Sequence, residues 1–142
     1  MSKQRIVLDT NCLLQIIPSR SPYRKIWDAF LSGKYYLCIT TSILNEYEEI
    51  IGIHSSKDVA ISITTAIINS PYIIKVDPFY NFYLIYSDPD DNKFVDCAIA
   101  SNARYIVTED SHFNVLREIE FPKVNITRLD DYLKELEACS EE

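Results

Sequence analysis

Short apolar runs alternate along the chain with longer segments in which apolar residues recur at helical spacing. The short runs are rich in β-branched and aromatic residues, and the first contains an unbroken apolar stretch, as in strands buried on both faces. Strands are predicted over residues 5–9, 35–40, 72–76, 105–108 and 124–127, and helices over 11–17, 22–32, 42–51, 56–69, 88–103 and 129–137. This alternation predicts an α/β domain with a mostly parallel central sheet covered by helices on both faces.

Proline and glycine mark the boundaries of one of these helices. Ser21 followed by Pro22 is typical of an N-cap with proline in the first helical position, and Gly33 fits the C-terminal stop of the same helix. The aromatic segment FYNFYLIYS, residues 79–87, is ambiguous and is predicted as a strand or hairpin that packs in the core or at an interface.

Composition narrows the class of protein. The chain has 142 residues, of which 47% are hydrophobic, so we expect one folded domain over residues 1–142. It contains only two glycines and neither a GxGxxG nor a GxxxxGK[ST] motif, which argues against a Rossmann cofactor site and a P-loop. The chain opens without the apolar core of a signal peptide, and no apolar run reaches membrane-spanning length. We therefore expect a cytoplasmic protein that does not enter a membrane.

The cysteines do not indicate a zinc site. They are widely scattered without a CxxC pair, and neither histidine lies near them at zinc-ligand spacing. Cys12, Cys38 and Cys97 lie among apolar neighbours, so they are predicted to be small core residues in a reducing compartment.

Carboxylates fall at the positions where an α/β fold builds its functional site, beyond the carboxyl ends of the strands. Asp9 closes the first predicted strand, and Asp110 follows the fourth. Glu46 lies in the second turn of the helix after the second strand. Asp91 and Asp96 lie in the first two turns of the helix before the fourth strand. All of them are expected to converge on one rim of the sheet.

Helical angles select one glutamate. Steps of about 100° per residue place Glu46 beside the apolar stripe of its helix and Glu49 nearly opposite, with Glu48 as a weaker candidate. The same reasoning does not separate Asp91 from Asp96, since each aligns with apolar residues of its helix. Position along the helix favours Asp96 as the metal ligand. The helix dipole already explains an acid near the N-terminus, such as Asp91, whereas it does not explain Asp96. An acid on an apolar helical face needs another compensation, and a metal ion supplies it.

Clustered carboxylates repel one another, and hard cations such as Mg²⁺ and Mn²⁺ relieve that repulsion because they prefer oxygen ligands. Mg²⁺ keeps several waters, so such a site holds a nucleophilic water. One ion, or two about 4 Å apart, activates that water and stabilises the leaving oxygen of a phosphodiester. The constellation therefore supports metal-assisted hydrolysis.

Four motifs together resemble the PIN-domain family, and most of all its bacterial members that are toxin components of toxin–antitoxin modules. They are IVLDTNCLL, SILNEYEE around Glu46, DPDDNKFVDCAIAS and YIVTEDSHF, and they follow the family's order over residues 6–113. The resemblance implies a three-layer α/β/α PIN fold and a Mg²⁺- or Mn²⁺-dependent endoribonuclease that cuts single-stranded RNA. It further implies an antitoxin partner and a homodimer.

The resemblance also assigns residues. Asp9, Glu46 and Asp110 match three of the family's catalytic, metal-binding acids. Asp96 in VDCAIA is the closest match to the remaining acid, and Asp91 resembles an extra acid found in part of the family. Polar residues that support the first and last carboxylates are matched by Asn11 and Thr108, and Glu109 is an unusual neighbour of Asp110.

Other interpretations exist for each motif. Taken alone, each is better explained as a helix cap, a solvated helix charge or an acidic turn. A phosphatase of the haloacid dehalogenase type also opens with a strand-end aspartate, but a second aspartate is expected where Asn11 stands. A catalytically silent PIN-like binding module, or a receiver-like one, is the remaining alternative. A receiver-like domain requires an acidic pair near its start and a lysine after a late strand, and this sequence has neither.

The net charge bears on the substrate. A charge of −7 argues against gripping RNA by bulk electrostatics. Two divalent ions add four positive charges to −7 and leave −3, so RNA affinity is expected to be local and metal-dependent. An acidic groove also suits a basic antitoxin segment.

Overall fold

The computed structural model describes residues 3–78, 81–85 and 89–140. Its centre is a five-stranded sheet in the order β3-β2-β1-β4-β5, and every neighbouring pair is parallel. The strands are β1 Gln4–Leu8, β2 Tyr35–Ile39, β3 Ile73–Lys75, β4 Tyr105–Val107 and β5 Ile126–Thr127. The predicted α/β class with a parallel sheet is confirmed.

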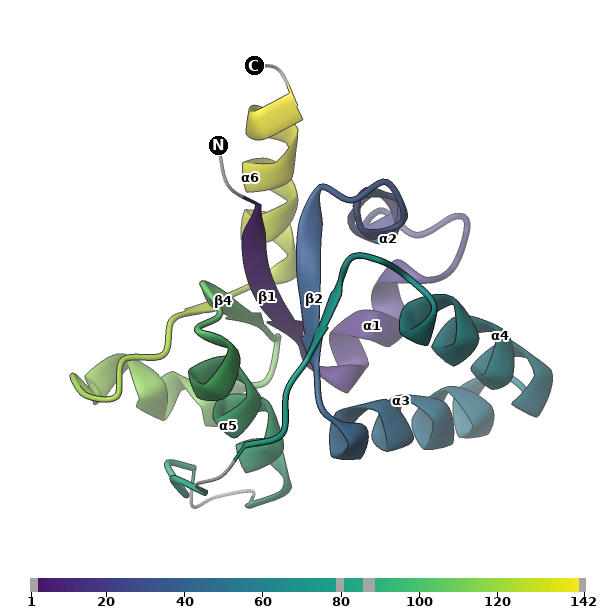
Figure 1. Ribbon diagram of the computed structural model, residues 1–142. Coiled ribbons are helices and arrows are strands. Elements are labelled where there is room, and N and C mark those ends of the chain that lie inside the picture. Colours follow the sequence, from purple (N-terminus) through teal and green to yellow (C-terminus); the bar gives the residue numbers. More distant parts are fainter. Residues whose placement is uncertain (1–2, 79–80, 86–88, 141–142) are drawn as a thin grey trace.

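Helices fill the connections between the strands (Figure 1). The α-helices are α1 Thr10–Ile16, α2 Arg24–Leu31, α3 Thr41–His54, α4 Lys57–Ile68, α5 Asn92–Ser101 and α6 Leu129–Ser140, and the 3₁₀ helices are η1 Pro89–Asp91 and η2 Ser111–Glu118. From β1 the chain moves outward through β2 to β3, and then crosses back through α5 to β4. Because connections between parallel strands are right-handed, this reversal places α5 on the face opposite α1–α4.

The reversal creates a switch point between β1 and β4, where the connections leave in opposite directions. In open α/β sheets the crevice beyond the strand ends at such a point is where ligands bind. Register completes the arrangement, since Leu8 pairs with Val107 and so places Asp9 beside Thr108.

The core follows the apolar pattern of the sequence. Ile6, Val7 and Leu8 in β1 are all buried, which explains why this strand is apolar without alternation. Three of the four cysteines, Cys12, Cys38 and Cys97, are also buried as predicted.

A capping serine begins α4, and a glycine follows the end of α2. Ser56 caps α4 by accepting a hydrogen bond from the Val59 backbone N–H at 3.1 Å. Gly33 follows α2 with a φ of +78°, and a Cβ there would lie 2.5 Å from the Tyr72 ring, so both conformation and space require glycine.

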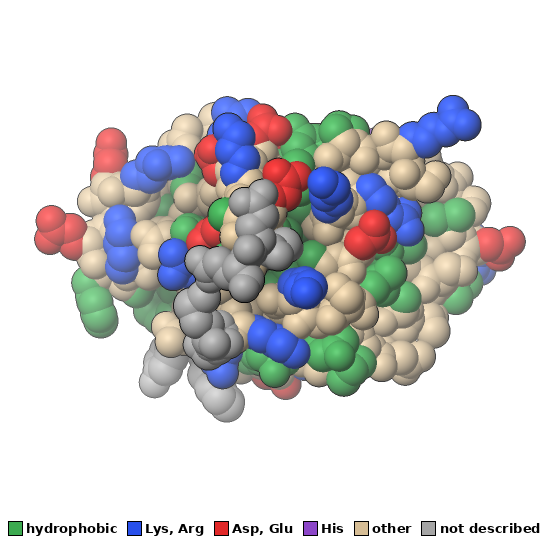
Figure 2. Space-filling model, turned by 90° about the horizontal axis from the view of Figure 1, so that it is seen from above, with side chains coloured by type: hydrophobic (Ala, Val, Ile, Leu, Met, Phe, Trp, Pro, Cys, Tyr) green, Lys and Arg blue, Asp and Glu red, His purple; other side chains and the backbone are tan. Residues whose placement is uncertain are grey.

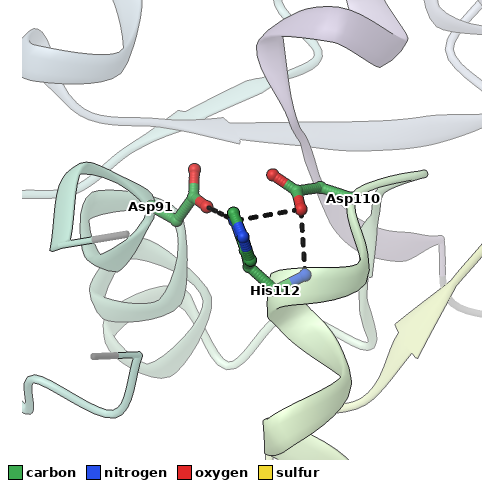
Figure 3. A group of neighbouring side chains, drawn as sticks. All are labelled: Asp91, Asp110 and His112. Atoms are coloured by element: carbon green, nitrogen blue, oxygen red, sulfur yellow. Dashed lines mark hydrogen bonds and ion pairs between the residues drawn. The ribbon is translucent and has the colours of Figure 1, made fainter. Parts of the chain in front are cut away.

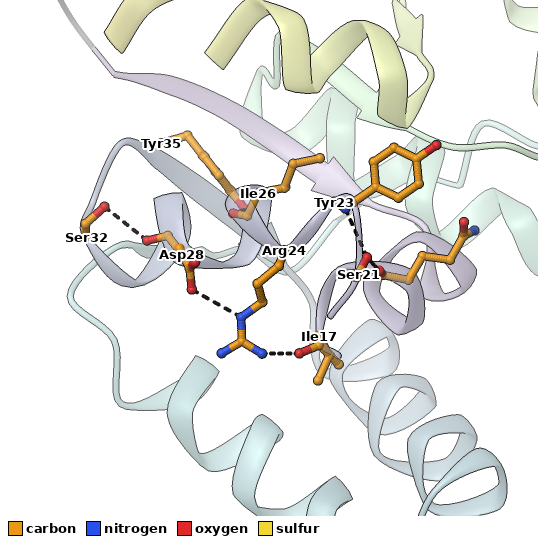
Figure 4. A network of polar contacts seen from close by, with 9 residues as sticks. Ile17, Ser21, Tyr23, Arg24, Ile26, Asp28, Ser32 and Tyr35 are labelled. Atoms are coloured by element: carbon orange, nitrogen blue, oxygen red, sulfur yellow. Dashed lines mark hydrogen bonds and ion pairs between the residues drawn. The ribbon is translucent and has the colours of Figure 1, made fainter. Parts of the chain in front are cut away.

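The predicted start of α2 is wrong. The helix begins at Arg24 and not at Pro22, because the Ser21 hydroxyl accepts a hydrogen bond from the Tyr23 N–H at 3.0 Å and closes a separate turn (Figure 4). Arg24 then ties this turn to the helix, since its guanidinium donates to the Ile17 carbonyl and pairs with Asp28 at 3.2 Å.

The aromatic segment also departs from the prediction. Residues 81–85 form no strand, and residues 79–80 and 86–87 of the segment lie outside the described residues. The backbone of Ile85 bonds instead to the Asn92 side chain, which accepts from its N–H at 2.9 Å and donates to its carbonyl at 2.8 Å. The helix predicted over 88–103 is a 3₁₀ turn, η1, followed by α5, and Asp88 is not among the described residues.

The end of the molecule that carries the chain termini lies at the amino ends of the strands (Figure 1). Seen from this end, basic and acidic side chains are interspersed (Figure 2). Within the described residues no helix combines the length and apolar character needed to cross a membrane.

Candidate metal centre

Two strand ends place the first two carboxylates of the candidate site. Asp9 directly follows β1, and its backbone N–H donates to the Val107 carbonyl at the end of β4 at 3.1 Å. Asp110 lies three residues beyond Val107 and caps η2. The sheet itself therefore brings Asp9 and Asp110 to the switch point, and Asp9 is only 5% exposed there.

Thr108 connects these two acids. Its buried hydroxyl donates a hydrogen bond to Asp9 Oδ2 at 2.9 Å and accepts one from the Asp110 backbone N–H at 3.0 Å. A hydroxyl that both donates and accepts fixes the carboxylate on one side and the backbone on the other. The structure thus places Thr108 where it orients both strand-end acids.

A third acid, Asp91, lies opposite Asp110 on the other side of the His112 side chain (Figure 3). Asp91 ends η1 and, together with Asp110, flanks the imidazole of His112. His112 Nδ1 lies 3.2 Å from Asp110 Oδ1 and 3.7 Å from Asp91 Oδ2. One ligand atom from each of these three residues lies within 4.8 Å of the other two, close enough to share a metal ion.

Glu46 enters from α3. Its carboxylate accepts a hydrogen bond from the Thr10 hydroxyl and pairs with Lys93 Nζ at 2.5 Å. It is half-buried, whereas Glu48 and Glu49 are exposed, so the helical-angle argument predicted the correct orientation for this helix.

The charges of the site act on one another. Burial raises the pKa of Asp9, and repulsion by Asp110 and Glu46 raises it further, while the hydrogen bond from Thr108 lowers it. The net effect is an Asp9 pKa above its ordinary value. Asp110 and Glu46 are therefore close enough to disfavour the ionised form of Asp9, and a bound cation would favour it.

Asp96, which sequence reasoning placed first for the remaining acid, lies apart from this cluster. Its carboxylate accepts a hydrogen bond from the Phe82 backbone N–H at 3.0 Å and borders a pocket of about 370 Å³ that also involves Val76, Asp77 and Ile99. Burial raises the pKa of Asp96 as well. The observed partner of Asp96 is the 81–85 segment, which explains how an acid is accommodated on an apolar helical face.

The supporting residues divide similarly. Asn11 is exposed in the first turn of α1, and its side chain forms no hydrogen bond with any residue that the structure describes, so its support of Asp9 stays a prediction. Glu109 points away from the acids, because its carboxylate accepts from Arg128 Nε at 2.6 Å and from the Leu129 backbone N–H at 3.3 Å. It therefore acts at the start of α6.

Sequence reasoning missed His112. A lone histidine in a polar turn carries no signal of its own, and η2, the helix that follows Asp110, was not predicted. Its position two residues after Asp110 was the available clue, since the Asp110 carboxylate also accepts from the His112 backbone N–H at 2.9 Å.

The donor set suits a hard divalent cation. The buried Asp9 and Asp91 and the half-buried Glu46 and Asp110 offer carboxylate oxygens, which Mg²⁺ and Mn²⁺ prefer, and the imidazole of His112 is compatible with Mn²⁺. Burial and the neighbouring acids raise the Asp9 pKa, and a cation at this position would stabilise the ionised carboxyl.

An all-parallel sheet with acids gathered at its switch point is typical of open α/β domains that bind a ligand beyond their strand ends. The sequence identifies the family more closely, because the PIN domain family model matches residues 5–112. The chain belongs to the PIN domain family. Among curated proteins no significant relative was found.

Solved structures share the fold at low sequence identity. A chain of VapBC2 from Rickettsia felis, crystallised with a promoter DNA fragment, is 18% identical with a TM-score of 0.59, over 87% of this chain and 98% of that one. A chain of DNA-bound VapBC from Salmonella typhimurium is 15% identical with a TM-score of 0.61, over 89% and 98%. The PIN domain endonuclease Utp24 is 17% identical with a TM-score of 0.51, over 87% and 84%.

Proposed function

We propose that this PIN-domain protein is a Mg²⁺- or Mn²⁺-dependent endoribonuclease that hydrolyses phosphodiester bonds of single-stranded RNA. The observation that carries the proposal is the convergence of four acids from four separate segments at the β1/β4 switch point. Asp9 and Asp110 come from strand ends, Glu46 from α3 and Asp91 from η1. A protein with no use for a cation gains nothing by burying acids that repel one another.

The residues have separate tasks in this proposal. Asp9, Asp91 and Asp110 would hold the cation, with Glu46 and His112 completing its surroundings. When bound, the ion supplies an activated water and charge stabilisation at the leaving oxygen. Thr108 keeps the Asp9 carboxylate oriented through its hydroxyl.

We assign the third acid to Asp91 in preference to Asp96. Asp91 shares His112 with Asp110, whereas the carboxylate of Asp96 is bonded to the 81–85 segment. Asp96 accordingly becomes a residue that holds that segment against α5.

The biological setting we propose is the toxin of a toxin–antitoxin module in the cytoplasm. Its support is the similarity in fold to chains of two DNA-bound structures named VapBC2 and VapBC. An antitoxin partner with a basic segment would complement the acidic crevice, and a homodimer is the assembly we expect.

The function is tested by incubating the protein with single-stranded RNA in Mg²⁺ or Mn²⁺ and comparing it with Asp9→Asn and Asp110→Asn. Each substitution is expected to lower the cleavage rate on the order of a thousandfold, because each removes charge that holds the cation in the reaction. Asp58→Asn, an exposed acid in the first turn of α4, is the matched control and should cleave normally. Equal cleavage by all four proteins, or cleavage in excess chelator, contradicts the proposal.

A further inference from the structure

The 3₁₀ helix η2 presents a polar row beside the candidate metal centre. A 3₁₀ helix has three residues per turn, so side chains three positions apart lie above one another. In η2 this aligns Ser111, Asn114 and Arg117 along one row, and all three are exposed. Phe113 and Leu116 form a second row that is fully buried. The buried row anchors η2 in the core and thereby fixes the direction of the polar row.

The polar row forms one wall of a pocket of about 540 Å³. The second wall consists of residues 108–110, which include Asp110 of the candidate metal centre, and the third of residues 126–128. Asp110 thus borders both this pocket and the candidate metal centre. Its lining is almost entirely polar, with Ile126 as the single large apolar side chain among the described residues that border it.

The charges of the pocket leave one cation available. Arg128 pairs with Glu109 at 2.6 Å, so this guanidinium is already neutralised. Arg117 forms no ion pair or side-chain hydrogen bond with any residue in the described part of the chain. Of the two remaining pocket acids, Asp110 belongs to the candidate metal centre, and Glu118 lies on the row of His112 and Val115 and not on that of Arg117.

We propose that this pocket binds a backbone phosphate of the RNA strand that neighbours the scissile phosphate, with Arg117 as the cation that recognises it. The inference rests on the proposed function. A guanidinium matches the geometry of a phosphate through two parallel hydrogen bonds. Asn114 and Ser111 add neutral donors along the same row. A polar wall without an aromatic ring suits a phosphate better than a stacked base.

This arrangement answers the problem posed by a net charge of −7. RNA affinity from one locally placed arginine requires no basic surface, and it positions the strand relative to Asp110. Phosphate contacts of this kind fix the register of a strand and carry no sequence information.

The test uses a single-stranded RNA that the wild-type protein cleaves at one mapped bond. Each of the two phosphates on either side of that bond is replaced, one at a time, by an uncharged methylphosphonate. For the wild type, one replacement is expected to lower kcat/KM about tenfold, the size of a lost charged hydrogen bond at an exposed site. Arg117→Gln should show the same loss on the unmodified RNA and no further loss on that methylphosphonate RNA.

Two variants control for charge. Lys34→Gln removes one positive charge from an exposed position just before β2, at the opposite end of the sheet, and should leave kcat/KM unchanged. Arg117→Lys retains the charge without the paired hydrogen bonds and should recover part of the loss. The dependence of kcat/KM on salt should also weaken by about 0.7 in log–log slope for Arg117→Gln, the amount expected for one phosphate of a single strand.

The inference is overturned if Arg117→Gln cleaves like Lys34→Gln, or if it remains as sensitive as the wild type to every methylphosphonate. Failure of the proposed function is a different result, in which the wild type does not cleave the RNA at all in Mg²⁺ or Mn²⁺.

Discussion

The strand-end acids and the helical acids of the candidate centre reach it by different means. Asp9 and Asp110 are placed by the pairing of β1 with β4, and Thr108 bonds to both. Glu46 and Asp91 arrive on α3 and η1, and each depends on partners outside the sheet, Lys93 and His112. Sheet register therefore fixes the first pair, whereas tertiary packing decides which helical acid joins it.

The sharpest contrast among the helical acids is between Asp91 and Asp96. Asp91→Asn is expected to lower RNA cleavage about a hundredfold, because it removes a charge that faces Asp110 across His112. Asp96→Asn should change cleavage less than about threefold. The asparagine oxygen still accepts the hydrogen bond from the Phe82 N–H, and the lost charge is not one that we expect to bind the cation. Rates in Mn²⁺ measure both, and a larger loss for Asp96→Asn would restore the assignment that sequence position favoured.

Thr108 is the link between the strand-end acids, so Thr108→Val should weaken Mn²⁺ binding about tenfold through misorientation of the Asp9 carboxylate. Thr64→Val is the matched control, because the buried Thr64 hydroxyl donates to the Ala60 carbonyl at 2.8 Å within α4. The control should lower thermal stability without altering the Mn²⁺ affinity measured by calorimetry. Equal Mn²⁺ affinity in both variants contradicts the role given to Thr108.

The raised Asp9 pKa gives the metal-free protein a defined pH dependence. A carboxyl whose pKa is higher in the folded state stabilises the fold below its unfolded pKa, about 3.9, and loses that contribution as pH rises through the folded pKa. In chelator, the wild type should therefore melt at a lower temperature than Asp9→Asn at pH 7, and the gap should close towards pH 4. Saturating Mn²⁺ should reverse the order at pH 7, because it favours the ionised wild-type site. A gap in chelator that is independent of pH would contradict this account.

Substitution of Glu109 is expected to have the smallest effect, because its carboxylate faces the start of α6 and not the other acids. Glu109→Gln should lower the free energy of unfolding by about 0.5 kcal/mol, since its partner Arg128 is largely exposed and solvent screens the pair. RNA cleavage should stay within about twofold of the wild type. Denaturant unfolding and initial rates measure the two quantities, and a large change in rate with unchanged stability would place Glu109 in the catalytic machinery.

The sequence predicted the fold well, because its main signals are local. The apolar runs of β1 and β4 and the helix-ending Gly33 each act within a few residues, and their elements appear as expected. The predicted start of α2 and the predicted strand at residues 81–85 were wrong. Ser21 closes a turn of its own before α2, and the Asn92 side chain binds the backbone of Ile85 from outside that segment.

The candidate acids Asp9, Asp110 and Glu46 were chosen by position along a strand or angle around a helix. Both considerations are local, and the structure brings these three acids near one another. Their role in a metal site stays a prediction. The choice between Asp91 and Asp96 depends on the path of the 81–85 segment and on His112 in η2, and neither contact leaves a periodic pattern.

The central claim is that a divalent cation binds at the β1/β4 switch point through Asp9, Asp91 and Asp110. Calorimetric titration of the metal-free protein with Mn²⁺ tests it most directly, with Asp9→Asn, Asp91→Asn and Asp96→Asn measured alongside the wild type at one pH and salt concentration. We expect the wild type and Asp96→Asn to bind Mn²⁺ alike, and Asp9→Asn and Asp91→Asn each to bind at least about tenfold more weakly. No binding to the wild type, or equal binding by all four proteins, would contradict it.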